Sequence, residues 1–207
     1  VGAMTERGGC DRWNGVTAFR RGHVVGRADK ERRMPFGDYL PWRELIGSRS
    51  CRDLRPSEGQ TVLPFAGWVG VLLCYDEVEP GPARARVAAG ARWLAGFTND
   101  AWYDETRQPW LHERMARMRA VETGRDLVRA VNTGLSSWIG PDGRVRVRLS
   151  ENVRGHLVFE VGARRRETPY VAIGDAFGAA LGLAIAALAI RDARDQRRRK
   201  TSGGGGR

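Results

Sequence analysis

A cysteine that directly follows an apolar run is the first feature of this sequence that could perform chemistry. Residues 70–76 read GVLLCYD, so Cys74 comes after a run with strand character and just before Tyr75 and Asp76. A strand that ends at a turn holds a thiol in place, and the backbone N–H groups of the turn can stabilise an oxyanion. Most cysteines are instead small hydrophobic residues of the core. Position alone therefore leaves both a nucleophile and a core residue open.

The histidines and the remaining cysteines do not have the spacing of a metal site. His23, His112 and His156 lie far apart, and the sequence contains neither a CxxC nor an HxxxH pattern. Structural zinc sites depend on such closely spaced pairs. The sequence therefore predicts no metal and no other cofactor, and it is compatible with a disulfide between Cys10 and Cys51.

The strongly basic balance of the chain raises the question of an anionic partner. The 207 residues carry a formal net charge of +11, which is typical of proteins that bind nucleic acid or an anionic membrane surface. After Ile190, seven basic residues stand against two acidic ones, whereas the two kinds are interspersed over the rest of the chain. Neither interleaved aromatic residues nor a nucleic-acid-binding motif accompanies the basic residues, so the sequence predicts no nucleic-acid partner.

Hydrophobic periodicity predicts strands that alternate with helices and are followed by hairpins. Leu111, Met115, Met118 and Val121 recur at helical spacing, which predicts a helix over 109–122 with this stripe in the core. The order of elements is typical of a mixed α/β fold in which helices cover a sheet. The other expected elements are a hairpin within 13–40 about residues 20–22, a strand pair within 61–74, a helix over 82–91, a strand over 92–97, a strand and turn over 126–134, a hairpin over 135–149 and a strand over 155–161.

An apolar segment near the C-terminus predicts a helix that crosses a membrane. Residues 176–190 contain no charge. Extension back to Val171 gives roughly the 20 residues that span a bilayer, although it includes Asp175. A buried core helix is the alternative at this length. The basic residues after Ile190 favour the membrane span, because positive charge marks the cytoplasmic side.

Three separate stretches carry motifs of one protein family. Residues 29–41 read DKERRMPFGDYLP, residues 72–77 read LLCYDE, and residues 97–134 begin FTNDAW and end VNTG. Together they resemble the carbon–nitrogen hydrolase, or nitrilase, superfamily, and more narrowly its membrane branch, the apolipoprotein N-acyltransferases. The matched residues are Lys30, Pro35 to Tyr39 and Pro41 for the motif K…PFGEYVP; Cys74, Tyr75 and Asp76 for CYE; Asn99 to Trp102, His112, Met115 to Ala120, Glu122, Gly124, Arg125, Arg129 and Asn132 to Gly134 for the longest run; and Thr168 to Tyr170, Gly174 and Asp175 for TPY…GD.

The resemblance implies a fold class and a location. The fold is α/β, a partial nitrilase-like α-β-β-α layered sandwich followed by one C-terminal transmembrane helix. Residues 1–163 would form the C-terminal part of a carbon–nitrogen hydrolase domain, 164–190 a linker and the transmembrane helix, and 191–207 a basic disordered tail. The expected location is the bacterial inner membrane, with the catalytic domain on the periplasmic face and the tail in the cytoplasm.

The resemblance also implies a reaction. Members of the branch use a Glu–Lys–Cys triad to move an acyl chain from a phospholipid, through a cysteine thioester, to the N-terminal amine of a diacylglyceryl-cysteine lipoprotein. The implied partners are a phospholipid donor, a lipoprotein acceptor and the membrane. Carried over to this sequence, Cys74 would be the nucleophile, and Lys30 would stabilise the thiolate and the oxyanion. Asp38 would hold Lys30 in place. Tyr75, Asp76 and Trp102 would bind the substrate.

The general base of the family is a glutamate well upstream of the lysine. Glu6 and Glu31 do not lie in that context. We therefore expect the sequence to be the C-terminal part of a longer enzyme and to be inactive in this form. Asp38 and Asp76 stand where the family commonly has Glu, and a displacement of about 1 Å can cost ~100-fold in rate. An inactive remnant and a soluble-type amidase that hydrolyses a small amide are the alternatives.

Overall fold

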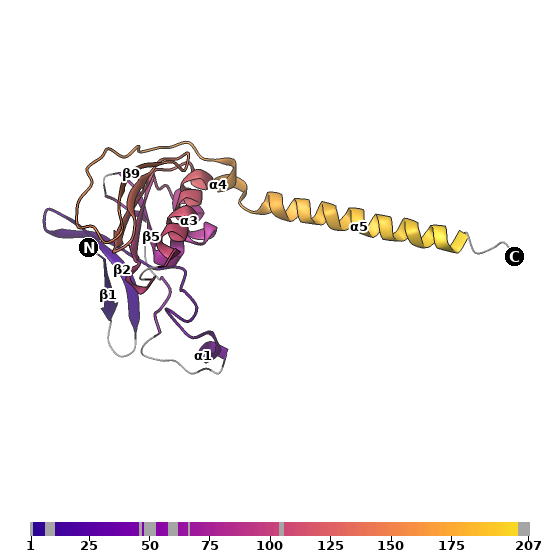
Figure 1. The fold of residues 1–207 in the computed structure, drawn as a ribbon, viewed down its shortest axis with the longest axis horizontal. Helices are drawn as coiled ribbons and strands as arrows, with labels where there is room; N and C mark the ends of the chain where they lie inside the picture. The colour runs from indigo at the N-terminus through magenta and orange to yellow at the C-terminus, as the bar shows by residue number, and fades with distance from the viewer. Residues whose placement is uncertain are drawn as a thin grey trace. The chain divides into compact units, whose positions relative to one another are not determined.

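The computed structural model describes residues 2–6, 11–45, 47, 53–57, 62–65, 67–103 and 106–202. The chain divides into two compact units, Val1–Val171 and Ala172–Arg207 (Figure 1). The first unit holds both β-sheets and the helices that cover them, together with a short arm helix, α1 (Pro41–Leu45). All of the residues that we consider for the functional site belong to this first unit.

A six-stranded sheet forms the centre of the first unit. Its strand order is β4-β5-β6-β7-β8-β9. Strands β5, β6 and β7 run parallel to one another, whereas the outer pairs are antiparallel. The carboxyl ends of the three parallel strands therefore share one edge of the sheet, where ligands bind in open α/β sheets. The strands are β4 (Val62–Leu63), β5 (Val69–Leu73), β6 (Trp93–Asn99), β7 (Leu127–Asn132), β8 (Ser136–Ile139) and β9 (Val145–Leu149).

A second, three-stranded antiparallel sheet packs on one face of the six-stranded sheet. Its strands are β1 (Gly2–Glu6), β2 (Arg12–Arg20) and β3 (His23–Asp29). Arg21 and Gly22, between β2 and β3, have positive φ angles of 51° and 83°, as a two-residue hairpin turn requires. The hairpin predicted within 13–40 is thus confirmed. The two sheets share an apolar cluster of Val16, Ala28, Leu63, Val69, Val71, Leu73 and Ala95.

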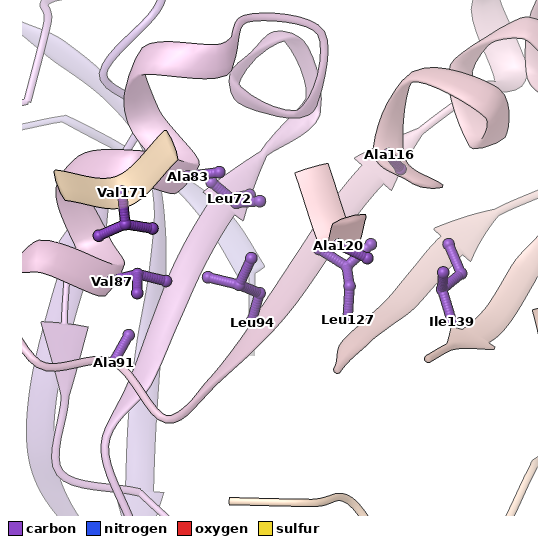
Figure 2. Packing of buried hydrophobic residues seen from close by; sticks show 10 residues of the cluster. All are labelled: Leu72, Ala83, Val87, Ala91, Leu94, Ala116, Ala120, Leu127, Ile139 and Val171. Carbon is purple, nitrogen blue, oxygen red and sulfur yellow. The ribbon is translucent and has the colours of Figure 1, made fainter. Parts of the chain in front are cut away.

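Helices α2 (Pro80–Ala88) and α3 (Gln108–Thr123) cover the opposite face of the six-stranded sheet. Side chains alternate along β5, so Val71 faces the small sheet and Leu72 faces the helices. Figure 2 shows how strand leucines meet small helix residues, and each buried leucine contributes about 1.5–3 kcal/mol. Helix α4 (Pro169–Ile173) adds Val171 to this cluster. The described residues therefore form three layers of the predicted α-β-β-α sandwich: helices, sheet and sheet.

Helix α3 does not bury the stripe that its sequence predicts. Leu111, Met118 and Val121 are 44%, 56% and 51% exposed, so the prediction that they form core is wrong. The buried face instead carries polar residues. These find partners inside: Glu113 pairs with Arg148 of β9, and Arg119 donates to the carbonyl of Val78 at 2.6 Å. Satisfied hydrogen bonds offset the cost of burying such groups, so polarity alone does not place a helix residue outside.

The end of α3 and most elements after it agree with the predictions. Gly124, with a φ of 63°, caps α3 in the left-handed conformation, and β8 and β9 form the predicted hairpin over 135–149. Residues 155–161, predicted as a strand, join neither of the two sheets that the described residues form. In that segment, Phe159 stacks on Trp138 with ring centroids 5.2 Å apart. A ring contact, rather than a hydrogen-bonded ladder, holds this segment on the sheet.

The second unit contains helix α5 (Ala176–Ser202). No helix within the described ranges is both long and apolar enough to cross a membrane, so the transmembrane helix predicted within 171–190 is not supported. Gly174 has a φ of 57° and separates α5 from α4. Residues 191–202, predicted as part of a disordered tail, continue α5.

Candidate active site

A cavity of about 820 Å³ opens at the carboxyl ends of the parallel strands. Of the residues predicted for the site, Cys74, Lys30, Asp38 and Trp102 line this cavity together, although they come from segments far apart in the sequence. Tyr75 and Asp76 are not among the lining residues. The other lining residues had no predicted role in the site; they are Arg12, Asn14, Met34, Gly37, Leu54, Leu73, Phe97, Thr98, Asn99, Tyr103, Ala130, Val131, Asn132 and Ser136.

Cys74 lies on a sharp turn between β5 and a 3-10 helix, η1 (Cys74–Glu77). Its φ of 49° is in the left-handed region, which costs a non-glycine residue of the order of 1–3 kcal/mol. Contacts on both sides hold the turn: Leu73 N–H donates to Asp76 at 3.1 Å, and the Cys74 carbonyl lies 3.2 Å from a ring nitrogen of His112. Such strain at the rim of a cavity is typical of a residue positioned for chemistry.

The electrostatic surroundings of Cys74 favour the neutral thiol. Burial raises the pKa of the Cys74 thiol, and the nearby Lys30 ammonium opposes that rise. Three carboxylates, those of Glu77, Asp38 and Asp100, raise the pKa of the thiol further. The thiol is therefore mostly protonated at neutral pH, and a reaction through its thiolate needs a base. Cys74 is a free thiol, and Cys10 and Cys51, with the disulfide considered between them, lie outside the described residues.

Lys30 and Asp38 form an ion pair in the wall of the cavity. Lys30 follows β3 and is 2% exposed, and its Nζ lies 2.5 Å from Oδ2 of Asp38. The same oxygen accepts a hydrogen bond from the Met34 N–H at 2.6 Å, which fixes the carboxylate. The Lys30 N–H donates to the carbonyl of Asn14 on β2 at 2.8 Å. A buried ammonium with a fixed partner and a fixed backbone presents its charge to the cavity without reorganisation.

Asp76 lies behind the cysteine turn and not in the cavity. Its side chain is fully buried, and it accepts hydrogen bonds from the N–H groups of Arg32 at 2.6 Å and Leu73 at 3.1 Å. Arg86, itself 1% exposed, pairs with the same carboxylate at 3.2 Å. Burial raises the pKa of Asp76, and Arg86 and the backbone donors oppose that rise. Asp76 thus ties the segment after Lys30 to the end of β5, and it does not line the cavity in which substrate binding was predicted for it.

A layer of buried charges lies beneath Cys74, and the motifs that contain Asp100, His112 and Arg129 did not predict that these residues belong to the site. The Glu77 carboxylate lies 3.0 Å from Arg129 Nε and 3.3 Å from His112 Nε2, and His112 Nδ1 lies 3.2 Å from Asp100. Burial lowers the pKa of His112, but the hydrogen bond with Asp100 and the charge of Glu77 outweigh it and raise the pKa. Gly96 on β6 makes room for the layer, because a Cβ there would lie 1.7 Å from Glu77 Oε1.

Two asparagines continue the row of residues that Cys74 begins. Asn99 ends β6 and Asn132 ends β7; they are paired in register, and Asn132 Nδ2 donates to Asn99 Oδ1 at 3.2 Å. Cys74 follows the end of β5, the next strand in the sheet. A polar residue at the end of each predicted strand was the signal in the sequence, since the carboxyl ends of adjacent parallel strands meet at one edge.

The fold and this site define a class of protein, and comparisons with known proteins agree with it. The carbon–nitrogen hydrolase family model matches residues 1–170, and the chain belongs to this family. The resemblance predicted from the motifs is therefore confirmed. Among solved structures, a carbon–nitrogen hydrolase from Helicobacter pylori G27 superimposes with a TM-score of 0.59 at 18% identity, over 72% of this chain and 57% of that one. An amidase from a Nesterenkonia species gives a TM-score of 0.56 at 26% identity, over 73% and 56%.

Curated relatives point to one branch of the family. The chain is 36% identical to the apolipoprotein N-acyltransferase of Geobacter metallireducens over 182 residues, which cover 82% of this chain and 34% of that protein. It is 34% identical to the protein of that name from Bradyrhizobium diazoefficiens over 179 residues, or 82% of this chain and 33% of the relative. The chain thus spans about a third of the length of these relatives.

Proposed function

We propose that this chain carries the nucleophile and the lysine of an apolipoprotein N-acyltransferase reaction. The substrates are a phospholipid, which supplies the acyl chain, and the N-terminal amine of a diacylglyceryl-cysteine lipoprotein, which receives it. The observation that supports this most is the placement of Cys74 on a strained turn in the same cavity as the buried Lys30–Asp38 pair. Similarity to the curated acyltransferases favours acyl transfer over hydrolysis. Both substrates are lipids, so we place the reaction at the periplasmic face of the bacterial inner membrane.

The first half-reaction forms a thioester on Cys74. The thiolate adds to the ester carbonyl carbon of the phospholipid, and the resulting oxyanion lies near the Lys30 ammonium, which stabilises it. The carbon–oxygen bond of the ester then breaks, and the departing alkoxide takes up a proton to give a lysophospholipid. Trp102 is 83% exposed and lines the cavity, as does Phe97, so the acyl chain has apolar surface to contact.

The second half-reaction transfers the acyl chain to the amine. The neutral amine of the lipoprotein adds to the thioester carbonyl, the carbon–sulfur bond breaks, and Cys74 leaves as the thiolate. The amine proton leaves the new amide nitrogen, so the net products are the N-acylated lipoprotein and the free thiol. Lys30 again faces the oxyanion of this step, because the same carbonyl carbon reacts in both halves.

Removal of the thiol proton needs a general base, and the described residues that line the cavity include no carboxylate free for this step. Asp38 is the carboxylate residue among those lining the cavity, and it already binds Lys30. Glu31 is not among the lining residues and pairs with Arg86 at 3.0 Å. We therefore propose that the 207-residue chain by itself forms the thioester slowly or not at all at neutral pH, since the pKa of its thiol is raised. High pH replaces the base by ionising the thiol directly.

The experiment supplies a phospholipid with a labelled acyl chain, in detergent micelles at pH 9, together with a diacylglyceryl-cysteine peptide. We expect label on the protein that hydroxylamine removes, and label on the peptide amine that it does not. A short amide, supplied separately, tests the amidase alternative, which the similarity to the Nesterenkonia amidase keeps open. Label that passes to water at the same rate with and without the peptide would overturn the acyltransferase proposal, as would turnover of the short amide alone.

A further inference from the structure

His112 of α3 is the one histidine among the described residues that is buried beneath the nucleophile. It is 2% exposed, whereas His23 and His156 are both exposed. Its Nδ1 lies 3.2 Å from Oδ1 of Asp100, and its Nε2 lies 3.2 Å from the carbonyl oxygen of Cys74. Oε2 of Glu77 lies 3.3 Å from the same Nε2. Each ring nitrogen therefore faces oxygen atoms that accept hydrogen bonds.

The chemistry of these neighbours fixes the protonation state of the ring. Carboxylate and carbonyl oxygens have no hydrogen to donate, so a ring nitrogen that faces them satisfies them only when it carries a hydrogen. A neutral imidazole has one nitrogen without a hydrogen, and its lone pair would point at an oxygen in either tautomer. The imidazolium has a hydrogen on both nitrogens and satisfies both sides of the site.

The charge balance of the layer leads to the same state. Glu77 and Asp100 are negative and Arg129 is positive, and all three are at most 2% exposed. A protonated His112 makes the four groups neutral together, whereas a neutral ring leaves one buried negative charge uncompensated, which is costly. The neighbouring charges are paired separately, because Glu113 of α3 binds Arg148, and Lys30 binds Asp38. The raised pKa of His112 agrees with this balance.

We infer that His112 is a positioning residue, protonated at neutral pH, that holds the Cys74 turn. Its Nε2–H donates to the Cys74 carbonyl, and Asp100 and Glu77 fix the ring that makes this bond. The bond keeps Cys74 in the left-handed conformation, with φ at 49°, that places the thiol in the cavity. His112 is not a lining residue and does not touch the substrate. The effect on acyl transfer depends on the proposed function, but the effect on the thiol does not.

The protonation state is tested on the unaltered chain by nitrogen NMR of its three histidines. At pH 7.5 we expect both ring nitrogens of His112 to carry hydrogen. The assignment comes from the disappearance of one signal set in His112→Gln. A ring of His112 that is neutral at pH 7.5 would overturn the inference.

The positioning role is tested through the rate at which iodoacetamide alkylates Cys74, followed by peptide mass mapping. We expect His112→Ala to change the rate of alkylation at least about tenfold in either direction, because the Cys74 turn loses the contact that holds the thiol in the cavity. His112→Gln keeps a neutral donor and should bring the rate part of the way back to that of the unaltered chain, and His156→Gln is the matched control without effect. A folded His112→Ala chain that reacts within twofold of the unaltered chain would contradict the role.

The acyl-transfer assay separates the two proposals. Where the chain transfers acyl groups, His112→Gln should lower kcat and leave KM unchanged, because His112 positions the thiol without touching substrate. A raised KM with unchanged kcat would contradict the positioning role. Absence of transfer by the unaltered chain at pH 9 would count against the proposed function alone, and the NMR and alkylation experiments would still decide the role of His112.

Discussion

The two sides of Cys74 are built in different ways. On the cavity side, one ion pair between Lys30 and Asp38 faces a space of about 820 Å³ and is open to a ligand. On the opposite side, the charges are sealed from solvent and contact the backbone of the turn. The residues of this buried layer are Glu77, Asp100, His112 and Arg129.

This difference separates chemistry from positioning. A residue on the cavity side can touch a substrate, so its replacement changes a rate while the fold persists. A residue of the buried layer acts only through the Cys74 turn, so its replacement changes stability and the place of the thiol together. Cys74 lies between the two sides, and substitutions on either side test whether their effects on rate and on stability differ in this way.

The largest effect is expected at Cys74 itself. Cys74→Ala removes the atom that would carry the acyl chain, so acyl transfer should disappear and no thioester should form. The fold should persist, because alanine is smaller and the thiol makes no side-chain hydrogen bond in the described site. Intact mass before and after exposure to the acyl donor measures this. Transfer at the normal rate by Cys74→Ala would sink the assignment of the nucleophile.

The next largest effect is expected at Lys30. Lys30→Met keeps the length of the side chain and removes the charge that faces the oxyanion, so the rate of thioester formation should fall by about 100-fold or more. Lys30→Arg should not restore it, because a planar guanidinium does not occupy the place of a compact ammonium. The measurement is the rate of thioester formation, with circular dichroism to verify that the variants are equally folded. A loss below threefold would mean that Lys30 is only structural.

Replacement of Asp76 should mainly lower the free energy of unfolding of the chain. Asp76→Ala leaves Arg86 and the N–H groups of Arg32 and Leu73 without this buried acceptor. Breaking a buried pair on one side costs about 3–5 kcal/mol of unfolding free energy. Urea denaturation measures the loss, with Glu160→Ala as the control because Glu160 is exposed. A loss equal to that of the control would show that Asp76 does not clamp the turn.

The raised pKa of His112 predicts the sign of one pH dependence. A histidine whose folded pKa exceeds its usual 6.5 contributes stability that is complete below pH 6.5. That contribution is lost as the pH rises through the folded pKa. The difference in unfolding free energy between the unaltered chain and His112→Gln should therefore shrink with rising pH above 6.5. A difference that grows over the same range would mean that the buried ring is neutral.

The smallest effects separate the two faces of α3. Met118→Ala removes a side chain that is 56% exposed, so the unfolding free energy should change by no more than about 0.5 kcal/mol. Ala116 on the opposite face is fully buried, and Ala116→Leu should cost about 1–3 kcal/mol through overpacking. Thermal unfolding of the two variants gives the comparison. A larger loss of stability in Met118→Ala than in Ala116→Leu would mean that the stripe of Leu111 and Met118 is part of the core after all.

Motifs in the sequence predicted four residues of the cavity side. Cys74, Lys30, Asp38 and Trp102 belong to motifs with fixed spacing, and the structure brings these four residues to one cavity. The strands that carry them also follow from local signals, such as the apolar run before Cys74 and the turn at Gly22. What these predictions share is that a few adjacent residues determine each of them.

The contacts of the buried layer could not be predicted in the same way, although Asp100, His112 and Arg129 belong to the longest motif. Glu77, Arg129 and His112 belong to three elements that meet only in the folded chain, and charged residues are ordinarily read as exposed. The same expectation placed the polar face of α3 outside and its apolar stripe inside. The membrane span predicted within 171–190 is not supported, because no helix among the described residues is both long and apolar enough to cross a membrane.

The most direct test of the account identifies which cysteine carries an acyl chain. A brief exposure of the folded chain to a long-chain p-nitrophenyl ester at pH 9, followed by peptide mass mapping, compares Cys74 with Cys10 and Cys51 in one sample. The account predicts acylation at Cys74 well ahead of the other two, and loss of that preference when the chain is unfolded in urea. Equal acylation of all three cysteines in the folded chain would contradict a thiol held for acyl transfer.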